Sequence, residues 1–151
     1  MDTIDNLGVI FSETLAEVIA TVTSIYLHSV PSEEDAGFEE ITGVMSLCSK
    51  KSGILFISAK EPDIRVLCSR MIGVPETDVT KEDIEDTLCE FVNMTAGNAK
   101  IRLSDPDYMF TLSPPFILEG KDMNIVTKSK THVISIALGN GEISVKLKFI
   151  C

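Results

Sequence analysis

The sequence predicts an α+β fold of two layers, in which helices pack on one face of a mainly antiparallel sheet. Apolar residues recur at spacings of three and four in the first and the longest helical segments, so each has one side to bury. Short apolar or alternating runs joined by tight-turn residues are typical of antiparallel strands. No repeat or linker-like stretch divides the 151 residues, and we expect residues 1–151 to form a single domain.

The chain is predicted to begin with a helix and a hairpin. The helix is predicted over residues 5–25, although the β-branched stretch 21–27 indicates fraying or a change to extended chain there. Strands are predicted over residues 38–49 and 54–58. The turn residues 50–53 between them indicate a hairpin.

Two further helices are predicted next. A short helix runs between Pro62, which suits a first helical turn, and Gly73, which suits a helix end. Thr80 and Asp83 resemble a capping box, in which side chains bond the first free backbone N–H groups of a helix. The capping box predicts the start of a long helix that runs to about Leu103.

The last third of the chain is predicted to be β-structure. Strands are expected over residues 108–112, 116–118, 131–138 and 142–150. Residues Gly139-Asn140-Gly141 form a typical tight turn, so the last two strands are predicted to be a hairpin.

The composition limits the classes of partner. The net charge is −10, with 23 acidic and 13 basic residues. This acidic surplus disfavours the phosphate backbone of nucleic acids and anionic membrane surfaces, so we expect neither as a partner. A protein partner is compatible with the charge, because local pairing at an interface can differ from the overall balance.

The cysteines and the N-terminus bear on cofactors and location. The four cysteines are widely spaced and neither histidine lies near a pair of them, so we expect no metal site in this chain. Scattered cysteines of this kind are typical of reduced thiols in a cytoplasmic protein. The N-terminal residues lack the basic and apolar regions of a signal peptide, and no continuous apolar stretch approaches the roughly 20 residues of a membrane helix. We therefore expect a cytoplasmic protein.

The long helix is predicted to have one buried and one exposed face, because each residue turns the helix by about 100°. The predicted buried side consists of Ile84, Leu88, Val92, Thr95, Ala99 and Leu103. The opposite side consists of Asp86, Glu90, Asn93 and Gly97.

Three residues of this exposed side stand out. Glu90 and Asn93 lie three apart, so their side chains are neighbours on the helix. Asn is a poor helix former, and a Gly inside a helix costs roughly 1 kcal/mol relative to Ala. One use of Gly97 is to let another surface come close. An ordinary solvated face is the alternative, because a Glu and an Asn at this spacing also occur by chance.

The stretch DTLCEFVNMTAGNAK, residues 86–100, resembles the signature helix of the CheC, CheX and FliY phosphatases, which act on the chemotaxis response regulator CheY. That signature has an Asp or Ser, a Glu four residues later and an Asn three after that, as Asp86, Glu90 and Asn93 stand here. A proline follows further downstream, where this chain has Pro115.

Among these proteins the chain most resembles CheX. CheC has two helices with the Glu-x-x-Asn pattern, whereas the first helix here has Ala16 three residues after Glu13 and Ala20 three residues after Glu17. The resemblance therefore implies one site per chain.

The resemblance implies that the substrate is the aspartyl phosphate of a CheY-like receiver domain, which supplies Mg²⁺ itself, and that this chain holds no cofactor. Asn93 would hold the attacking water in line with the P–O bond, because a carboxamide both donates and accepts hydrogen bonds. Glu90 would pair with the receiver's active-site lysine. Asp86 would add charge at the rim, and Gly97 would permit close approach.

Two other interpretations remain at this point. The middle domain of the flagellar switch protein FliM is related and scaffolds rather than hydrolyses, so the chain could be a non-catalytic binding or scaffold module. The retained Glu90 and Asn93 favour the enzyme over that module. A structural protein whose exposed helix face has no function is the second alternative, which Asn93 and Gly97 disfavour.

The resemblance also implies a homodimer joined through sheet edges. The predicted strand 142–150 alternates apolar residues with polar ones that include Lys146 and Lys148. An exposed edge strand of this kind pairs with another chain unless its lysines prevent it. We expect a homodimer on this basis.

Overall fold

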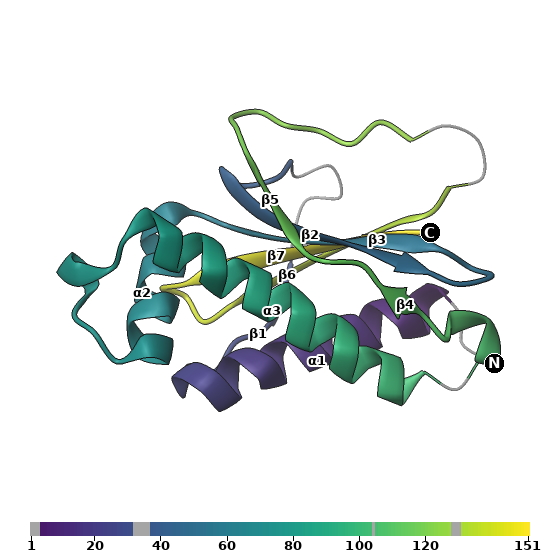
Figure 1. Cartoon of the computed structure of the whole chain (residues 1–151), viewed down its shortest axis with the longest axis horizontal. Helices are drawn as coiled ribbons and strands as arrows, with labels where there is room; N and C mark the ends of the chain where they lie inside the picture. The colour runs from purple at the N-terminus through teal and green to yellow at the C-terminus, as the bar shows by residue number, and fades with distance from the viewer. Residues whose placement is uncertain (1–3, 32–36, 104, 128–130) are drawn as a thin grey trace.

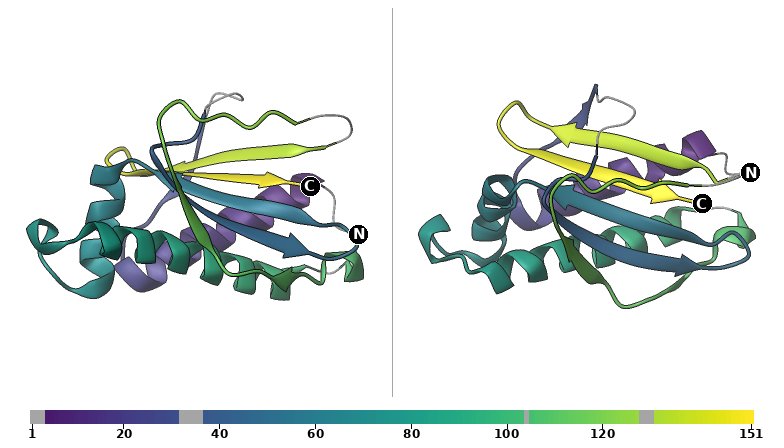
Figure 2. Two further views of the ribbon diagram at one scale, coloured as in Figure 1. Left: turned by 45° about the horizontal axis from the view of Figure 1, so that its top comes forward. Right: turned by 90° about the horizontal axis from the view of Figure 1, so that it is seen from above.

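The computed structural model describes residues 4–31, 37–103, 105–127 and 131–151. In this part of the chain, three α-helices pack on one face of an antiparallel sheet (Figure 1). Figure 2 shows the same two layers tilted forward and from above. The predicted two-layer α+β fold is confirmed.

The helices are α1 (Ile4–Thr23), α2 (Glu61–Ile72) and α3 (Lys81–Arg102). Helix α1 ends where its β-branched residues begin to accumulate, as predicted. Helix α2 has its proline in the first turn, and a left-handed Gly73 follows its end. Each predicted helix is therefore present.

In the described part of the chain, one helix has the length and apolarity to cross a membrane. This is α1, whose residues 6–23 have a mean hydropathy of 1.2. Half of that window is buried inside the fold. Leu7, Phe11, Leu15 and Ile19 are fully buried in the core, which accounts for the hydropathy of the helix.

The sheet contains seven strands within the described residues. They are β1 (His28–Val30), β2 (Ile41–Cys48), β3 (Gly53–Ala59), β4 (Thr111–Leu112), β5 (Phe116–Glu119), β6 (Val133–Gly139) and β7 (Ser144–Ile150). Their order is β1-β6-β7-β3-β2-β4, and β5 also pairs with β2. The predicted hairpins β2–β3 and β6–β7 are both confirmed.

The position of β7 corrects one prediction. Strand β7 pairs with β3 on one side and with β6 on the other, so it lies inside the sheet. The prediction that residues 142–150 form an exposed edge is wrong. The edges are formed by β1 on one side and by β4 and β5 on the other.

Residues 105–112 also differ from the prediction of a strand over 108–112. Residues Pro106–Tyr108 form a 3-10 turn, η2, and only Thr111–Leu112 pair with β2. The Asp105 carboxylate accepts a hydrogen bond of 2.9 Å from the Asp107 N–H, which favours the turn over extended chain. Strand β1 is an element that the sequence did not predict.

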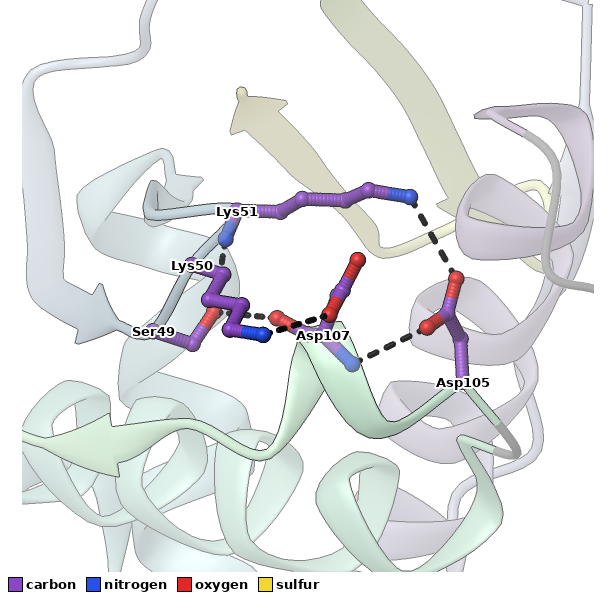
Figure 3. Close-up of polar contacts among 5 residues, drawn as sticks. All are labelled: Ser49, Lys50, Lys51, Asp105 and Asp107. Carbon is purple, nitrogen blue, oxygen red and sulfur yellow. Dashed lines mark hydrogen bonds and ion pairs between the residues drawn. The ribbon is translucent and has the colours of Figure 1, made fainter.

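The turn η2 is fastened to the β2–β3 hairpin, beyond the C-terminal end of α3 (Figure 3). The Ser49 hydroxyl donates to the Asp107 carbonyl at 2.6 Å, and the Lys51 ammonium lies 3.3 Å from the Asp105 carboxylate. The hydrogen bond from the Asp107 N–H, together with Lys51, lowers the pKa of Asp105. The chain that leaves α3 is thereby held against the sheet.

The sheet face opposite the helices is crossed by segments without regular structure. The residues after β5 arch over this face (Figure 1), and the Met123 carbonyl accepts a hydrogen bond of 3.4 Å from the Phe38 N–H. The Phe38 ring centroid lies 5.1 Å from that of Phe56 on β3. This face is therefore separate from the helical layer that positions the candidate site.

Candidate functional site

Helix α3 divides into the two faces that its sequence predicts. Its buried residues are Ile84, Thr87, Leu88, Phe91, Val92, Thr95, Ala96 and Ala99. Asp86, Glu90 and Asn93 are exposed on the other side, and Gly97 is half-buried. The structure thus brings all four predicted site residues onto one side of one helix.

The N-terminal end of α3 is fixed by its cap and by an ion pair. The Thr80 hydroxyl accepts a hydrogen bond of 3.1 Å from the Asp83 N–H, and the Asp83 carboxylate accepts one of 3.0 Å from the Thr80 N–H. The predicted capping box is therefore confirmed. The Lys81 ammonium lies 3.1 Å from the Glu119 carboxylate, which links the helix start to the end of β5.

The C-terminal end of α3 is tied to α1, which runs beside it (Figure 1). The Arg102 guanidinium pairs with the Glu17 carboxylate and donates to the Thr14 hydroxyl at 3.1 Å. This contact could not be predicted from the sequence, because residues 85 positions apart give no local pattern that links them. A basic residue in the last helical turn was the available signal.

The middle of α3 lies close to the sheet at Gly43 on β2. A Cβ atom at this position would lie 2.8 Å from the Val92 side chain and 3.1 Å from the Leu88 carbonyl. Only a residue without a side chain permits this approach. Gly43 thereby sets the distance of the candidate site from the core, and no local sequence pattern indicates this role.

Neither Glu90 nor Asn93 makes a side-chain hydrogen bond or ion pair within the described part of the chain. Both side chains are exposed, and exposed polar side chains hydrogen-bond mostly to water. Each can therefore bind a partner without breaking an internal contact. A carboxylate can accept hydrogen bonds from a cation, and a carboxamide can both donate and accept them.

The electrostatic surroundings of this face are acidic. Burial raises the pKa of the Cys89 thiol, and the neighbouring charges of Asp86 and Glu85 raise it further. Cys89 is therefore a neutral thiol at physiological pH and a poor nucleophile. Of the basic residues of α3, Lys81 at its start is paired with Glu119 and Arg102 at its end with Glu17, while Lys100 is exposed in the last turn.

Gly97 leaves the helix backbone uncovered on the site face, the exposed side of α3 that also carries Asp86, Glu90 and Asn93. A Cβ atom at this position would meet no other atom within 4 Å. Since nothing inside the described chain requires a glycine here, packing of the fold does not explain it. An approaching surface is the explanation that its position beside Asn93 favours.

The downstream Pro115 lies in the link between β4 and β5, close to the strand under α3. The Ser113 hydroxyl in this link accepts a hydrogen bond of 2.9 Å from the Ser46 N–H of β2. Phe116, which follows Pro115, pairs with Val44 next to Gly43. The link is therefore anchored at the part of β2 on which α3 packs.

Two cavities flank α3 without including the site residues. A groove of about 240 Å³ between α1 and α3 is lined by Asn98, Met94 and Arg102 together with residues of α1. A second, of about 320 Å³, lies between α2, the start of α3 and the end of β5. Glu90 and Asn93 instead lie on a convex helix face, which suits a macromolecular partner better than a small ligand enclosed by a pocket.

Helix α1 and the other acidic residues that the structure describes offer no second site of the same kind. Ala16 and Ala20 are half-buried on α1, and Glu17 is already paired with Arg102. Among the described residues, no group of three or more His, Cys, Asp or Glu side chains could hold a metal ion. The absence of a cofactor from this chain stays a prediction.

Comparison with known proteins decides the family. The family model described as chemotaxis phosphatase CheX matches residues 41–138, which include all of α3 and β5. This chain belongs to the CheX family. A search of curated protein sequences gave no match.

Solved structures agree with the CheX assignment at the level of the fold. A CheC-like superfamily protein from Shewanella sp. PV-4 has a TM-score of 0.82 at 22% identity, over 99% of this chain and 98% of that one. The chemotaxis protein CheX from Vibrio vulnificus has a TM-score of 0.81 at 20% identity, over 100% and 99%.

A third similar structure contains a partner. It is a CheX–CheY complex with BeF₃ and Mg²⁺ from Borrelia burgdorferi, whose CheX-family fold has a TM-score of 0.77 at 18% identity, over 93% of this chain and 95% of that one. The sequence-based assignment to CheX-like proteins is thereby confirmed. The roles of the individual site residues stay predictions.

Proposed function

We propose that this chain dephosphorylates the aspartyl phosphate of a CheY-type receiver domain. The observation that carries the proposal is the pair Glu90 and Asn93, exposed and unpaired on one convex face of a rigidly anchored helix. A phosphorylated receiver is a large, folded substrate, so a protruding helix can reach its phosphoryl group where a pocket could not.

In this proposal, Asn93 positions the attacking water. Its carboxamide oxygen accepts a hydrogen bond from the water, and its NH₂ group donates to a second oxygen, which holds the water in line with the P–O bond to be broken. An amide is a poor proton acceptor, so Asn93 orients the water and does not remove its proton. The role is comparable to that of the water-orienting Gln of GTPases.

Glu90 fixes the register of the two proteins in this proposal. Glu90 lies one helical turn from Asn93, and its free carboxylate pairs with the active-site lysine that a receiver holds beside its phosphate. Asp86 adds negative charge at the rim, and Gly97 lets the receiver backbone come close. Mg²⁺ and the remaining charge stabilisation come from the receiver.

The proposal includes a cytoplasmic location and a homodimeric assembly. The first follows from the scattered thiols of the sequence, and the second from the resemblance to CheX-like proteins. Neither is needed for the chemistry described above, since Glu90 and Asn93 come from one helix of one chain.

The test follows the loss of phosphate from a CheY-type receiver charged with a small phosphodonor, with and without this chain. We expect the native chain to accelerate the loss. Glu90→Ala should raise KM about 30-fold or more, since truncating one partner of a charge pair that is buried in the complex weakens docking. Glu85→Ala is the matched control, because Glu85 lies about 140° around the helix from Glu90; it should retain the native KM.

Two outcomes of this assay contradict the proposal. Binding of the phosphorylated receiver without acceleration would favour the non-catalytic module related to the FliM middle domain. If the native chain neither binds any receiver nor accelerates its loss of phosphate, the enzyme interpretation is excluded.

A further inference from the structure

Ile101 is an exposed apolar residue on the site helix that the fold does not use. Its side chain is 82% exposed, and it is the one large apolar residue of α3 with this degree of exposure. It does not belong to the buried core or to the partly buried residues packed against it. Ile is also less favourable in a helix than Leu, Lys or Arg, so helix formation does not explain it.

Isolated apolar residues are common on protein surfaces and need no explanation in general. The position of Ile101 on α3 is what distinguishes it. By helix geometry it lies about 20° from Glu90, about 40° from Gly97 and about 80° from Asn93 around the helix axis. Ile101 therefore lies at one side of the exposed face that carries the candidate site.

The spacing along the helix is compatible with contact to the same partner. At 1.5 Å per residue, Ile101 lies about 12 Å from Asn93 along the axis. A stable interface buries about 800 Å² on each protein, which corresponds to a radius of about 16 Å around its centre. An interface of this size centred on Asn93 is therefore wide enough to include Ile101.

The site face changes in character from one end to the other. Its N-terminal part carries Asp86 and Glu90, its middle carries Asn93 and Gly97, and its C-terminal part carries the exposed Lys100 and Ile101. Apolar side chains that become buried at an interface contribute affinity, whereas charges at the rim mainly steer the approach. The two ends of the face are therefore suited to different parts of one partner surface.

We propose that Ile101 is a specificity-determining docking residue, which packs against an apolar side chain of the receiver about 12 Å along the α3 axis from Asn93. The proposal rests on the proposed function, because it takes the receiver as the occupant of this face. It adds a requirement on the substrate: receivers with a polar surface at the matching position bind more weakly.

The test is a titration of a CheY-type receiver loaded with Mg²⁺ and beryllofluoride, a mimic of the phosphorylated state that is not hydrolysed. Ile101→Ser should raise Kd about tenfold, the effect of removing one buried apolar contact. Ile101→Met should restore Kd to within about twofold of the native value, because Met preserves the apolar volume. With phosphorylated receiver at saturation, kcat should be unchanged in both variants.

Val126→Ser is the matched control for loss of an exposed apolar residue. Val126 is 84% exposed in the segment after β5, which crosses the sheet face away from the helices (Figure 1). Its Kd should equal that of the native chain. An unchanged Kd in Ile101→Ser would overturn the proposal, as would a dimer in the native chain that Ile101→Ser dissociates, since the occupant would then be a second copy.

The outcomes separate this proposal from the proposed function. If the native chain binds the loaded receiver but does not accelerate dephosphorylation, the catalytic proposal fails and the titration still decides the role of Ile101. If the native chain accelerates dephosphorylation and Ile101→Ser has native KM and Kd, only the docking proposal fails. Failure of the native chain to bind any receiver overturns both.

Discussion

Glu90 and Asn93 are held in place by the backbone of α3 and not by other side chains. Neither has a hydrogen-bonding partner in the described part of the chain, so each can exchange water for a partner group without breaking an internal contact. Their placement depends on the helix being capped and anchored at both ends. At the scale of residues, the site therefore consists of two free side chains and one open backbone position, Gly97.

Gly97 gives a prediction in which stability and binding change in opposite directions. Gly97→Ala should raise the free energy of unfolding by about 1 kcal/mol, because Ala is the better helix former and its methyl group meets no atom of the chain. On a chain of this size, the rise corresponds to a Tm increase of about 2–4 °C. The same methyl group should weaken receiver binding severalfold, and Gly97→Leu should weaken it further.

Thermal unfolding and a binding titration on the same samples check this prediction. A gain in Tm without a loss of affinity would contradict the proposed close approach of the receiver. A loss of Tm would contradict the open surroundings of Gly97.

At the scale of elements, the distance between α3 and β2 determines how far the site projects. Leu88 and Val92 pack directly on the backbone of Gly43, and the capping box and the Arg102–Glu17 pair hold the two helix ends. A helix fixed at three points has little freedom to shift. The arrangement keeps Glu90 and Asn93 in a constant orientation, which suits the positioning of a water molecule.

Gly43→Ala should disturb this arrangement. The added methyl group would lie 2.8 Å from the Val92 side chain, so α3 must move outward or Val92 must change its conformation. Overpacking of this kind costs about 1–3 kcal/mol of the free energy of unfolding. Chemical denaturation measures the loss, and Gly97→Ala is the matched control because the same substitution is stabilising there. Unchanged stability in Gly43→Ala would show that α3 does not depend on this contact.

At the scale of the whole molecule, the open question is assembly. The predicted homodimer was expected to involve residues 142–150, but β7 is paired on both sides and offers no free edge. The available edges are β1 and the pair β4 and β5, and Phe116 and Leu118 of β5 are 47% and 41% exposed. An edge strand with exposed apolar residues is a common site of pairing between chains.

We therefore retain the prediction of a homodimer and assign it to a different edge. Light scattering at micromolar concentration should give twice the monomer mass of 16.5 kDa. Phe116→Lys should shift the mass toward that of the monomer, whereas Ser144→Lys on the paired β7 should not. A native monomer, or a dimer unaffected by Phe116→Lys, would contradict the assignment.

The sequence predicted features that depend on local pattern. The two faces of α3 follow from apolar spacing, and its start follows from Thr80 and Asp83, because capping involves residues only three apart. The position of β7 could not be predicted in this way. An alternating strand looks the same whether it lies at an edge or between two neighbours, and its partners are set by contacts distant in sequence.

The same limit applies to the contacts that hold the site. Glu17 and Arg102 meet because α1 and α3 lie side by side, and Gly43 is required only because α3 crosses that strand. Both facts depend on the assembled fold. For the site itself, apolar spacing predicted the exposed face of α3, and the family resemblance predicted the substrate. The exposure of Ile101 is known only from the structure.

The most direct test of the account compares two asparagines of one helix. Asn93→Ala should lower kcat for dephosphorylation of a CheY-type receiver by about 100-fold or more, with Kd for the beryllofluoride-loaded receiver within about twofold of native, because a misplaced water slows the chemical step without weakening docking. Asn98→Ala, which removes the same group about 140° around α3, should keep the native kcat. Full activity in Asn93→Ala, or an equal loss in both variants, would contradict the account.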